Sequence, residues 1–159
     1  MSDTKSKKSS GKIVPELHFK RLGREFAMQY LFQYDVNTDD IKEGSLELFW
    51  EQAKEIDAIP ASTFKRACRY AKRLIDGVIE SSDEINGYIT KYSKKWDIDR
   101  IGVVERNLMR IAIYEMVYCE DVPNVVSIDE AVEIVKDFST EQSINFVNGI
   151  LNAVMHSLK

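Results

Sequence analysis

The sequence has few of the residues that tight turns and cross-links require. Its 159 residues include seven glycines, three prolines and two cysteines. Because tight turns depend on glycine and proline, their scarcity favours helices over strands. No apolar run approaches the roughly 20 residues of a membrane span, and the Lys- and Ser-rich start lacks the apolar segment of a secretory signal. We therefore expect a globular protein with no membrane partner.

Catalytic and metal-binding motifs are also missing. Cys68 and Cys119 lie 51 residues apart, with no Cys-x-x-Cys and no nearby His pair, so the spacing of metal ligands is absent. The two thiols could form a disulfide, but we favour two reduced thiols and hence a cytoplasmic location. The sequence contains no Gly-rich phosphate loop, no His-Glu-x-x-His and no Gly-x-Ser-x-Gly elbow. We predict no enzyme, no cofactor and no metal site.

The charge is unevenly distributed along the chain. The net charge is −4, yet residues 1–24 hold seven Lys and Arg against two acidic residues, so the other 135 residues carry −9. A basic start on an acidic body is a common layout for a protein that meets a polyanion. For residues 1–11 a solubilising tail is the favoured alternative. We expect a flexible leader over residues 1–15 and one helical domain over residues 16–159.

Apolar residues at helical spacing predict an all-α fold of about seven helices. They are expected at about residues 16–34, 44–56, 60–78, 85–92, 101–118 and 131–135, with a last helix capped by Ser139 or Thr140. Two capping boxes, residues 81–84 and 127–130, are predicted to open the fourth and sixth helices. The helix over residues 101–118 is apolar on more than one side. It should therefore lie at the centre, between two packed three-helix subdomains.

One stripe of the first helix is the best candidate for a binding site. Arg21, Arg24, Met28 and Phe32 follow one another at intervals of three or four residues. Arginine binds phosphate through its planar fork, and an aromatic ring beside it can stack on an unpaired base. Single-stranded RNA rewards this combination, because its bases can turn out onto side chains. The alternative, slightly favoured by periodicity alone, is an ordinary charged surface with Phe32 tucked into the bundle.

Four short motifs follow in order along the C-terminal third of the chain. They are Arg110-Ile-Ala-Ile-Tyr-Glu115, Asp121-Val-Pro123, Asp129-Glu-Ala131 and Phe146-Val-Asn-Gly149. Because these four motifs occur together, in this order and at this spacing, the sequence resembles the NusB family. Members of that family are small all-helical RNA-binding factors of transcription antitermination and ribosomal RNA synthesis. The resemblance covers residues 16–159 and is firmest from residue 104 onward.

The resemblance implies a site for single-stranded, boxA-type RNA. The residues that occupy the corresponding positions are Lys20, Arg21, Arg24, Phe32, Tyr92, Gln142, Asn145 and Phe146. Phe32 stands where relatives commonly have tyrosine, which keeps stacking and removes one hydrogen bond. Asn145 stands where many relatives have lysine, a loss that the Lys-rich leader could compensate. Tyr92 and Phe146 could instead be packing residues.

The resemblance also implies a protein partner, the small-subunit ribosomal protein NusE, within an RNA polymerase antitermination complex. Glu105, Arg110 and Glu115 are the candidates for that contact, and ion pairs within their own helix are the alternative. Self-association into a homodimer is a further alternative. Two other functions stay possible: a detached domain related to the N-terminal part of a ribosomal RNA cytosine methyltransferase, and a purely structural helical adaptor.

Overall fold

The computed structural model describes residues 15–37, 45–54, 59–94 and 96–158, with the backbone alone for residues 15–18. Within these ranges the chain is helical and contains no strand. The elements are α2 (Pro15–Val36), α3 (Ser45–Ala53), α4 (Ala61–Glu80), α5 (Ser82–Ser93), the 3-10 turn η2 (Ile98–Arg100), α6 (Val103–Tyr118), α7 (Asn124–Val135) and α8 (Glu141–Ser157). The prediction of an all-α fold with about seven helices is confirmed. The predicted leader lies outside the described residues, except that Pro15 already belongs to α2.

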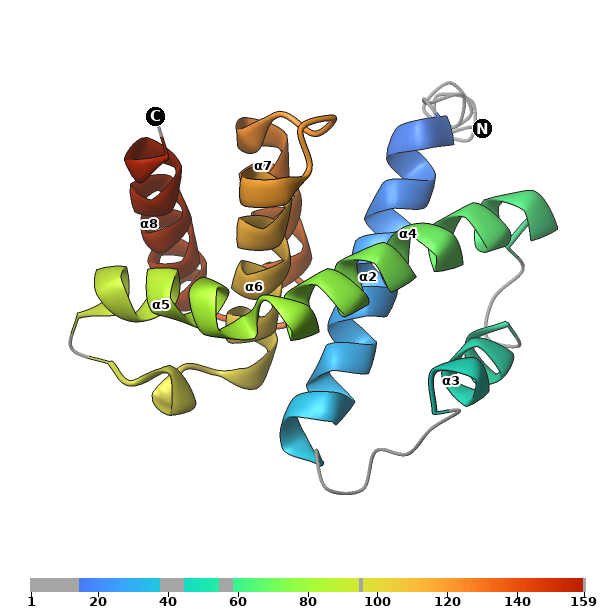
Figure 1. Cartoon of the computed structure of the whole chain (residues 1–159), viewed down its shortest axis with the longest axis horizontal. Helices are drawn as coiled ribbons and strands as arrows, with labels where there is room; N and C mark the ends of the chain where they lie inside the picture. Colours follow the sequence, from blue (N-terminus) through green and yellow to red (C-terminus); the bar gives the residue numbers. More distant parts are fainter. Residues whose placement is uncertain (1–14, 38–44, 55–58, 95, 159) are drawn as a thin grey trace, which may run out of the picture.

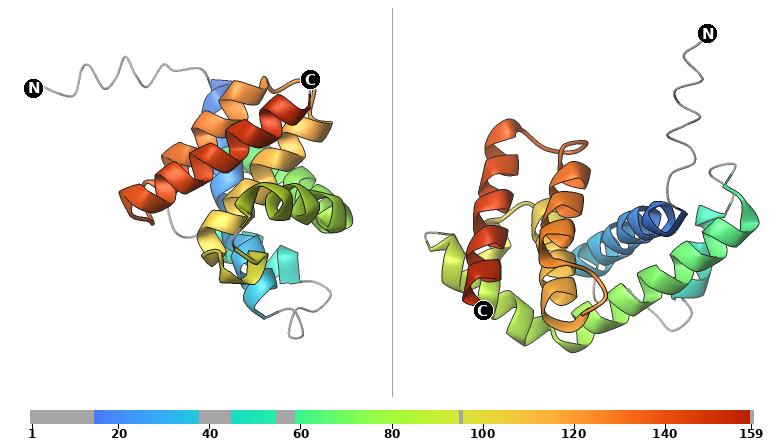
Figure 2. Two further views of the ribbon diagram at one scale, coloured as in Figure 1. Left: turned by 90° about the vertical axis from the view of Figure 1, so that its left-hand side faces the viewer. Right: turned by 90° about the horizontal axis from the view of Figure 1, so that it is seen from above.

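Helix α6 is the central element, as its apolar surface predicted. It contacts α2, α4, α5, α7 and α8, and the most extensive single contact joins α2 to α4. Figure 1 shows α6, α7 and α8 on one side of the molecule and α2, α3 and α4 on the other. Seen from above in Figure 2, α4 and α5 follow each other in one curved line that connects the two sides. Helices from both sides of the molecule therefore pack against α6.

The core joins an aliphatic centre to an aromatic cluster. Leu108, Met109, Ile111 and Ile113 of α6 are all within 1% of complete burial. The aromatic cluster brings Phe26 and Tyr30 of α2 onto rings of α3 and α4, with centroids 5.7–6.3 Å apart. Edge-to-face pairs at this separation add to the area that they bury. This cluster attaches the short helix α3, which could not be stable alone.

The predicted helix ends agree with the structure less well than the predicted helices do. Pro60 and Pro123 each immediately precede a helix, and Thr140 caps α8, where its hydroxyl accepts the backbone N–H of Ser143 at 3.2 Å. Both predicted capping boxes are wrong. Ser81 precedes α5 without a side-chain cap, and Ser127 lies inside α7, buried. The motif over residues 127–130 failed because its glutamate is held by arginines of α2 instead.

Both cysteines are free, as predicted. Cys119 is buried and Cys68 partly so, and burial raises the pKa of each thiol to about 11. They are therefore protonated packing residues at neutral pH. None of the described helices combines the length and the apolar character that crossing a bilayer requires.

Candidate nucleic-acid interface

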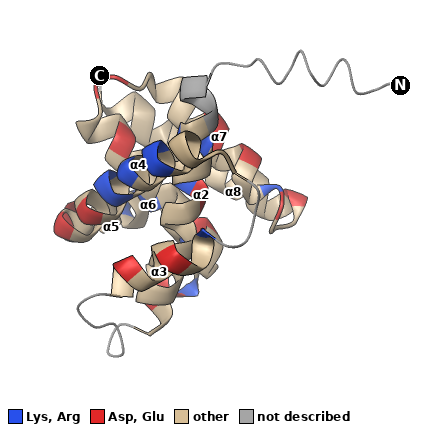
Figure 3. Ribbon diagram, turned by 90° about the vertical axis from the view of Figure 1, so that its right-hand side faces the viewer, with Lys and Arg blue, Asp and Glu red and all other residues tan. Residues whose placement is uncertain are grey.

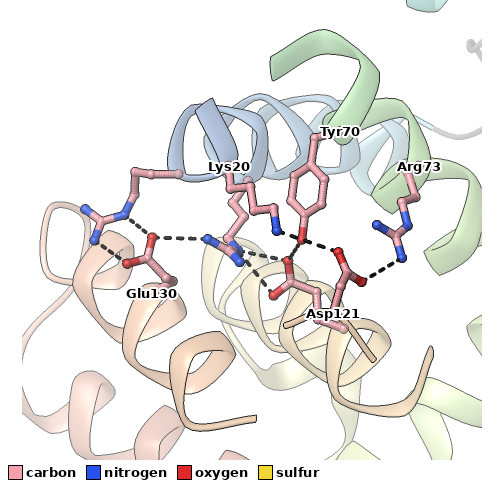
Figure 4. A network of polar contacts seen from close by, with 8 residues as sticks. Lys20, Tyr70, Arg73, Asp121 and Glu130 are labelled. Atoms are coloured by element: carbon pink, nitrogen blue, oxygen red, sulfur yellow. Dashed lines mark hydrogen bonds and ion pairs between the residues drawn. The ribbon is translucent and has the colours of Figure 1, made fainter. Parts of the chain in front are cut away.

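The cations at the start of α2 point toward carboxylates of α6, α7 and the loop between them. Arg24 donates from Nε to Glu115 at 2.9 Å and from Nη1 to Glu130 at 3.2 Å. Arg21 donates from Nη2 to the other oxygen of Glu130 at 2.8 Å. The hydroxyl of Tyr70, from α4, also donates to Glu115. Figure 4 shows Glu130 and Tyr70 on opposite sides of this network, which ties four helices together.

The prediction that Arg24 binds RNA is wrong. Its side chain is 2% exposed and its charge is already met by two carboxylates. Met28, the next member of the predicted stripe, is 3% exposed. The middle of the stripe therefore faces the inside of the bundle, whereas Arg21 at its start and Phe32 at its end, the latter 39% exposed, still reach solvent. Helical spacing identified residues that share a face but not the helix that covers it.

Lys20 and Arg21 keep part of their surface in solvent. The Arg21 side chain is 38% exposed beside Glu130, and Lys20 lies 3.6 Å from Asp121. Asp121 also accepts from Arg73 of α4 at 3.2 Å, as Figure 4 shows. In each of these pairs at least one partner is well exposed, and such a pair is weaker than a buried one and can exchange for a phosphate. These two residues therefore stay available to an anion, whereas Arg24 does not.

A second group of predicted residues meets around an open pocket. Gln142 and Phe146 of α8 line a hollow of about 330 Å³ together with Trp96, Arg100 and Glu105. Trp96 is 47% exposed although it is the largest side chain there. An exposed indole, a phenyl ring, a guanidinium and an amide thus converge from two segments of the chain. Asn145 is exposed, and neither it nor the half-buried Tyr92 lines this pocket.

The wall that carries Trp96 and Arg100 is held by specific hydrogen bonds. The hydroxyl of Ser93, at the end of α5, donates to the Trp96 carbonyl at 2.9 Å. Arg106 donates to the carbonyl of Ile101 at 2.9 Å and, at longer range, to two carbonyls of η2. On the other wall, the hydroxyl of Ser139 donates to Glu105 and so ties the start of α8 to α6. The pocket is therefore built on braced backbone.

Asp35, in the last turn of α2, anchors that bracing. Its carboxylate accepts from Arg106 Nε at 2.8 Å, from Arg110 Nη1 at 2.9 Å and from the Asn107 amide at 3.0 Å. Burial alone would raise the pKa of Asp35, but these hydrogen bonds outweigh it and lower the pKa to about 2. One carboxylate of α2 thus positions the arginine that shapes the loop beneath Trp96.

We expect Asp35→Asn to destabilise the protein at neutral pH and to destabilise it less as the pH falls toward 2. The pKa of Asp35 is depressed in the folded state, from 3.8 to about 2. Its contribution is therefore present above pH 3.8 and is lost as the pH falls toward 2. Because solvent still reaches the carboxylate, the expected loss at pH 7 is about 1 kcal/mol.

Urea denaturation of both proteins at pH 7 and at pH 2.5 measures this contribution. Asp76→Asn is the matched control, since Asp76 pairs with Lys72 in full solvent and should change nothing measurable. A destabilisation by Asp35→Asn that is equally large at both pH values would contradict a role for the charge.

The three residues predicted to meet a protein partner lie in different surroundings. Glu115 is fully buried within the α2 network, so the prediction that it contacts a partner is wrong. Arg110 binds Asp35 and, at 2.9 Å, the amide oxygen of Asn86. The alternative of pairing between Arg110 and Glu115 is also wrong, because each finds its partner on another helix. Glu105 lines the pocket and remains partly exposed.

Sequence reasoning missed Trp96 and Arg100. The signal was present, because Lys94-Lys95-Trp96 places a large aromatic directly after two cations in a short polar connection. An aromatic amid basic residues outside any helical stripe is typical of a surface that stacks bases. Only the fold, however, brings this connection against the first turn of α8.

Comparison with known proteins relates most of the chain to one family. The sequence pattern of the NusB family matches residues 21–156. The transcription antitermination protein NusB of Thermodesulfovibrio yellowstonii is 37% identical over 142 residues, covering 85% of this chain and 90% of the relative. NusB of T. maritima has a TM-score of 0.70 at 35% identity, covering 86% of this chain and 90% of its own. A crystal structure of the antitermination factors NusB and NusE with double-stranded RNA has a TM-score of 0.70 at 28% identity, covering 88% of this chain and 98% of its own. The family match includes both walls of the pocket.

Proposed function

This chain belongs to the NusB family, and from that premise we propose that it is a transcription antitermination factor that binds boxA-type RNA together with NusE. A relative of the same fold has been solved with NusE and double-stranded RNA. The observation in this chain that carries the proposal is the pocket that Trp96 and Phe146 line together with a guanidinium and an amide. Residues 16–159 would act as one RNA-binding domain, in the cytoplasm, where nascent transcripts are made.

The pocket suits an unpaired base. An indole and a phenyl ring offer stacking surfaces, and Arg100 offers a charge for the adjoining phosphate. The Gln142 amide can both donate to and accept from a base edge. Asn145 is exposed and directly precedes Phe146, so we propose that it contacts the phosphate backbone of the RNA. The surface proposed from the family resemblance also includes Lys20, Arg21, Phe32 and Tyr92. The role that we propose for this surface is binding without catalysis.

For the protein partner, Glu105 and Arg110 stay in the proposal. Both lie on α6, and both retain solvent contact beside the Trp96 pocket or the Asp35 cluster. A partner that contacts α6 at these positions would lie next to the RNA site. This arrangement would let RNA and NusE strengthen each other's binding and would bring the RNA to the RNA polymerase antitermination complex.

An electrophoretic shift assay tests the proposal. The protein is titrated into a short single-stranded RNA that contains boxA, into a scrambled RNA of equal composition, and into the boxA sequence annealed to its complement, each with and without NusE. We expect preferential binding of single-stranded boxA and a further gain in affinity with NusE. Equal retention of boxA and scrambled RNA in the presence of NusE would refute the proposal and leave a structural adaptor.

A further inference from the structure

The solvent side of α4 carries a concentrated positive charge. Lys65, Arg66, Arg69, Lys72 and Arg73 are all exposed and form what we call the α4 basic face. No acidic residue occurs between positions 61 and 75, so this face bears +5 in a chain whose net charge is −4. Figure 3 shows these cations following one another along the outer side of α4. These five residues precede Trp96 in the sequence, and none of them lines the Trp96 pocket.

Most of this positive charge is not neutralised by buried or tightly held carboxylates of the described residues. Lys65 and Arg69 have no carboxylate partner among the described residues. Lys72 and Arg73 pair with Asp76 and Asp121, but all four side chains are 42–56% exposed. Arg66 lies over the ring of Phe19, 4.2 Å from its centroid. Exposed pairs contribute little to stability, so a polyanion can replace these acids without cost to the fold.

We propose that the α4 basic face is a second RNA-binding surface, which holds the phosphate backbone of the transcript outside the segment bound at the Trp96 pocket. The inference rests on the proposed function and extends it from a short element to a longer strand. Lys65 to Arg73 spans about 12 Å of helix at 1.5 Å per residue. That length accommodates more than one phosphate, since each strand of a duplex carries one phosphate per roughly 3.4 Å of helix axis.

The chemistry of the face favours RNA over an acidic protein. Protein interfaces are anchored by buried apolar or aromatic side chains at their centre. The exposed large hydrophobic residues of the described chain lie on α2, α3, α6, α7 and in loops, and none lies on α4. A phosphate backbone needs no such anchor, and three arginines among five cations supply forked donors for it. Binding of this kind carries no base specificity.

The double variant Lys65→Gln with Arg69→Gln tests the inference. Both residues are exposed and unpaired within the described chain, so the fold should be unaffected. Affinity is measured across a salt series for a short boxA RNA and for the same RNA extended by about 20 nucleotides. For the extended RNA we expect the salt slope to fall by about 1.4 units, since two phosphate contacts are lost at about 0.7 of slope each, and the affinity at 0.1 M salt to drop roughly 25-fold. The short RNA should bind the variant and the wild type alike.

A charge-matched control separates local contact from net charge. Lys136→Glu, at the end of α7, lowers the net charge by the same two units and should leave the extended RNA bound as in the wild type. An extended RNA that binds the α4 double variant with unchanged slope and affinity overturns the inference and leaves an acidic protein as the occupant. A loss shared equally by the control overturns it as well. Failure of the wild type to distinguish boxA from scrambled RNA would sink the proposed function alone, because the α4 effect is read from RNA length.

Discussion

Replacing Arg24 by methionine is expected to lower the free energy of unfolding by about 3–5 kcal/mol. Among the residues that the structure describes, Arg24 is the only cation within hydrogen-bonding distance of Glu115, whose side chain is 0% exposed. Removing the guanidinium leaves that carboxylate buried with only the hydroxyl of Tyr70 beside it. The cost is the uncompensated desolvation of a charge rather than the loss of the pair itself. Thermal and urea denaturation at neutral pH measure it.

Two further variants separate this explanation from a role for Arg24 in RNA binding. Arg21→Met removes a cation whose side chain is 38% exposed and leaves Glu130 paired with Arg24, so its cost should be within about 1 kcal/mol. The combination Arg24→Met with Glu115→Leu removes the buried anion as well and should recover most of the loss. Recovery is favoured because Arg24 Nη2 has no hydrogen-bond partner in the described protein even in the wild type. An Arg24→Met protein of normal stability that no longer binds RNA would show that the buried network is not its role.

Much of the fold was predictable because helical periodicity records which residues are buried. The central place of α6 followed from apolar residues on more than one side, and the prolines before α4 and α7 marked their starts. The capping box over residues 127–130 failed for a tertiary reason. Glu130 accepts from Arg24, 106 residues away, and a local motif cannot compete with a charged hydrogen bond in a buried site.

The candidate site was predictable only in part. Gln142 and Phe146 were identified through the family resemblance, and the structure brings them together at one pocket. Trp96 and Arg100 were missed because their proximity to α8 depends on the α5–α6 connection, which Asp35 of α2 braces through Arg106. Arg24 was misassigned because an arginine in a helical stripe was taken as solvated. Whether Arg24 is solvated depends on its ion pairs with residues of other helices, and sequence spacing does not reveal those partners.

Removing the rings of the pocket is expected to have the largest effect on function. Trp96→Ala and Phe146→Leu should each weaken boxA RNA binding by about 1–3 kcal/mol, which is roughly five- to hundredfold in affinity. Trp96 is 47% exposed, so alanine should leave the fold intact. Phe146 packs partly against the core, and leucine keeps most of its apolar contact while removing the stacking face. Fluorescence anisotropy with a labelled boxA RNA measures each loss.

The matched control is Phe138→Ala, in the turn that follows α7. Phe138 is 54% exposed, comparable to Trp96, but does not line the pocket. If base stacking at the pocket holds the RNA, Phe138→Ala should bind as the wild type does, and both pocket variants should lose affinity equally at low and high salt. Stacking carries no net charge, so the salt slope should stay constant while the affinity falls. A changed slope with Trp96→Ala, or equal losses at Phe138 and Trp96, would mean that the rings act through the backbone contacts or the fold and not on the bases.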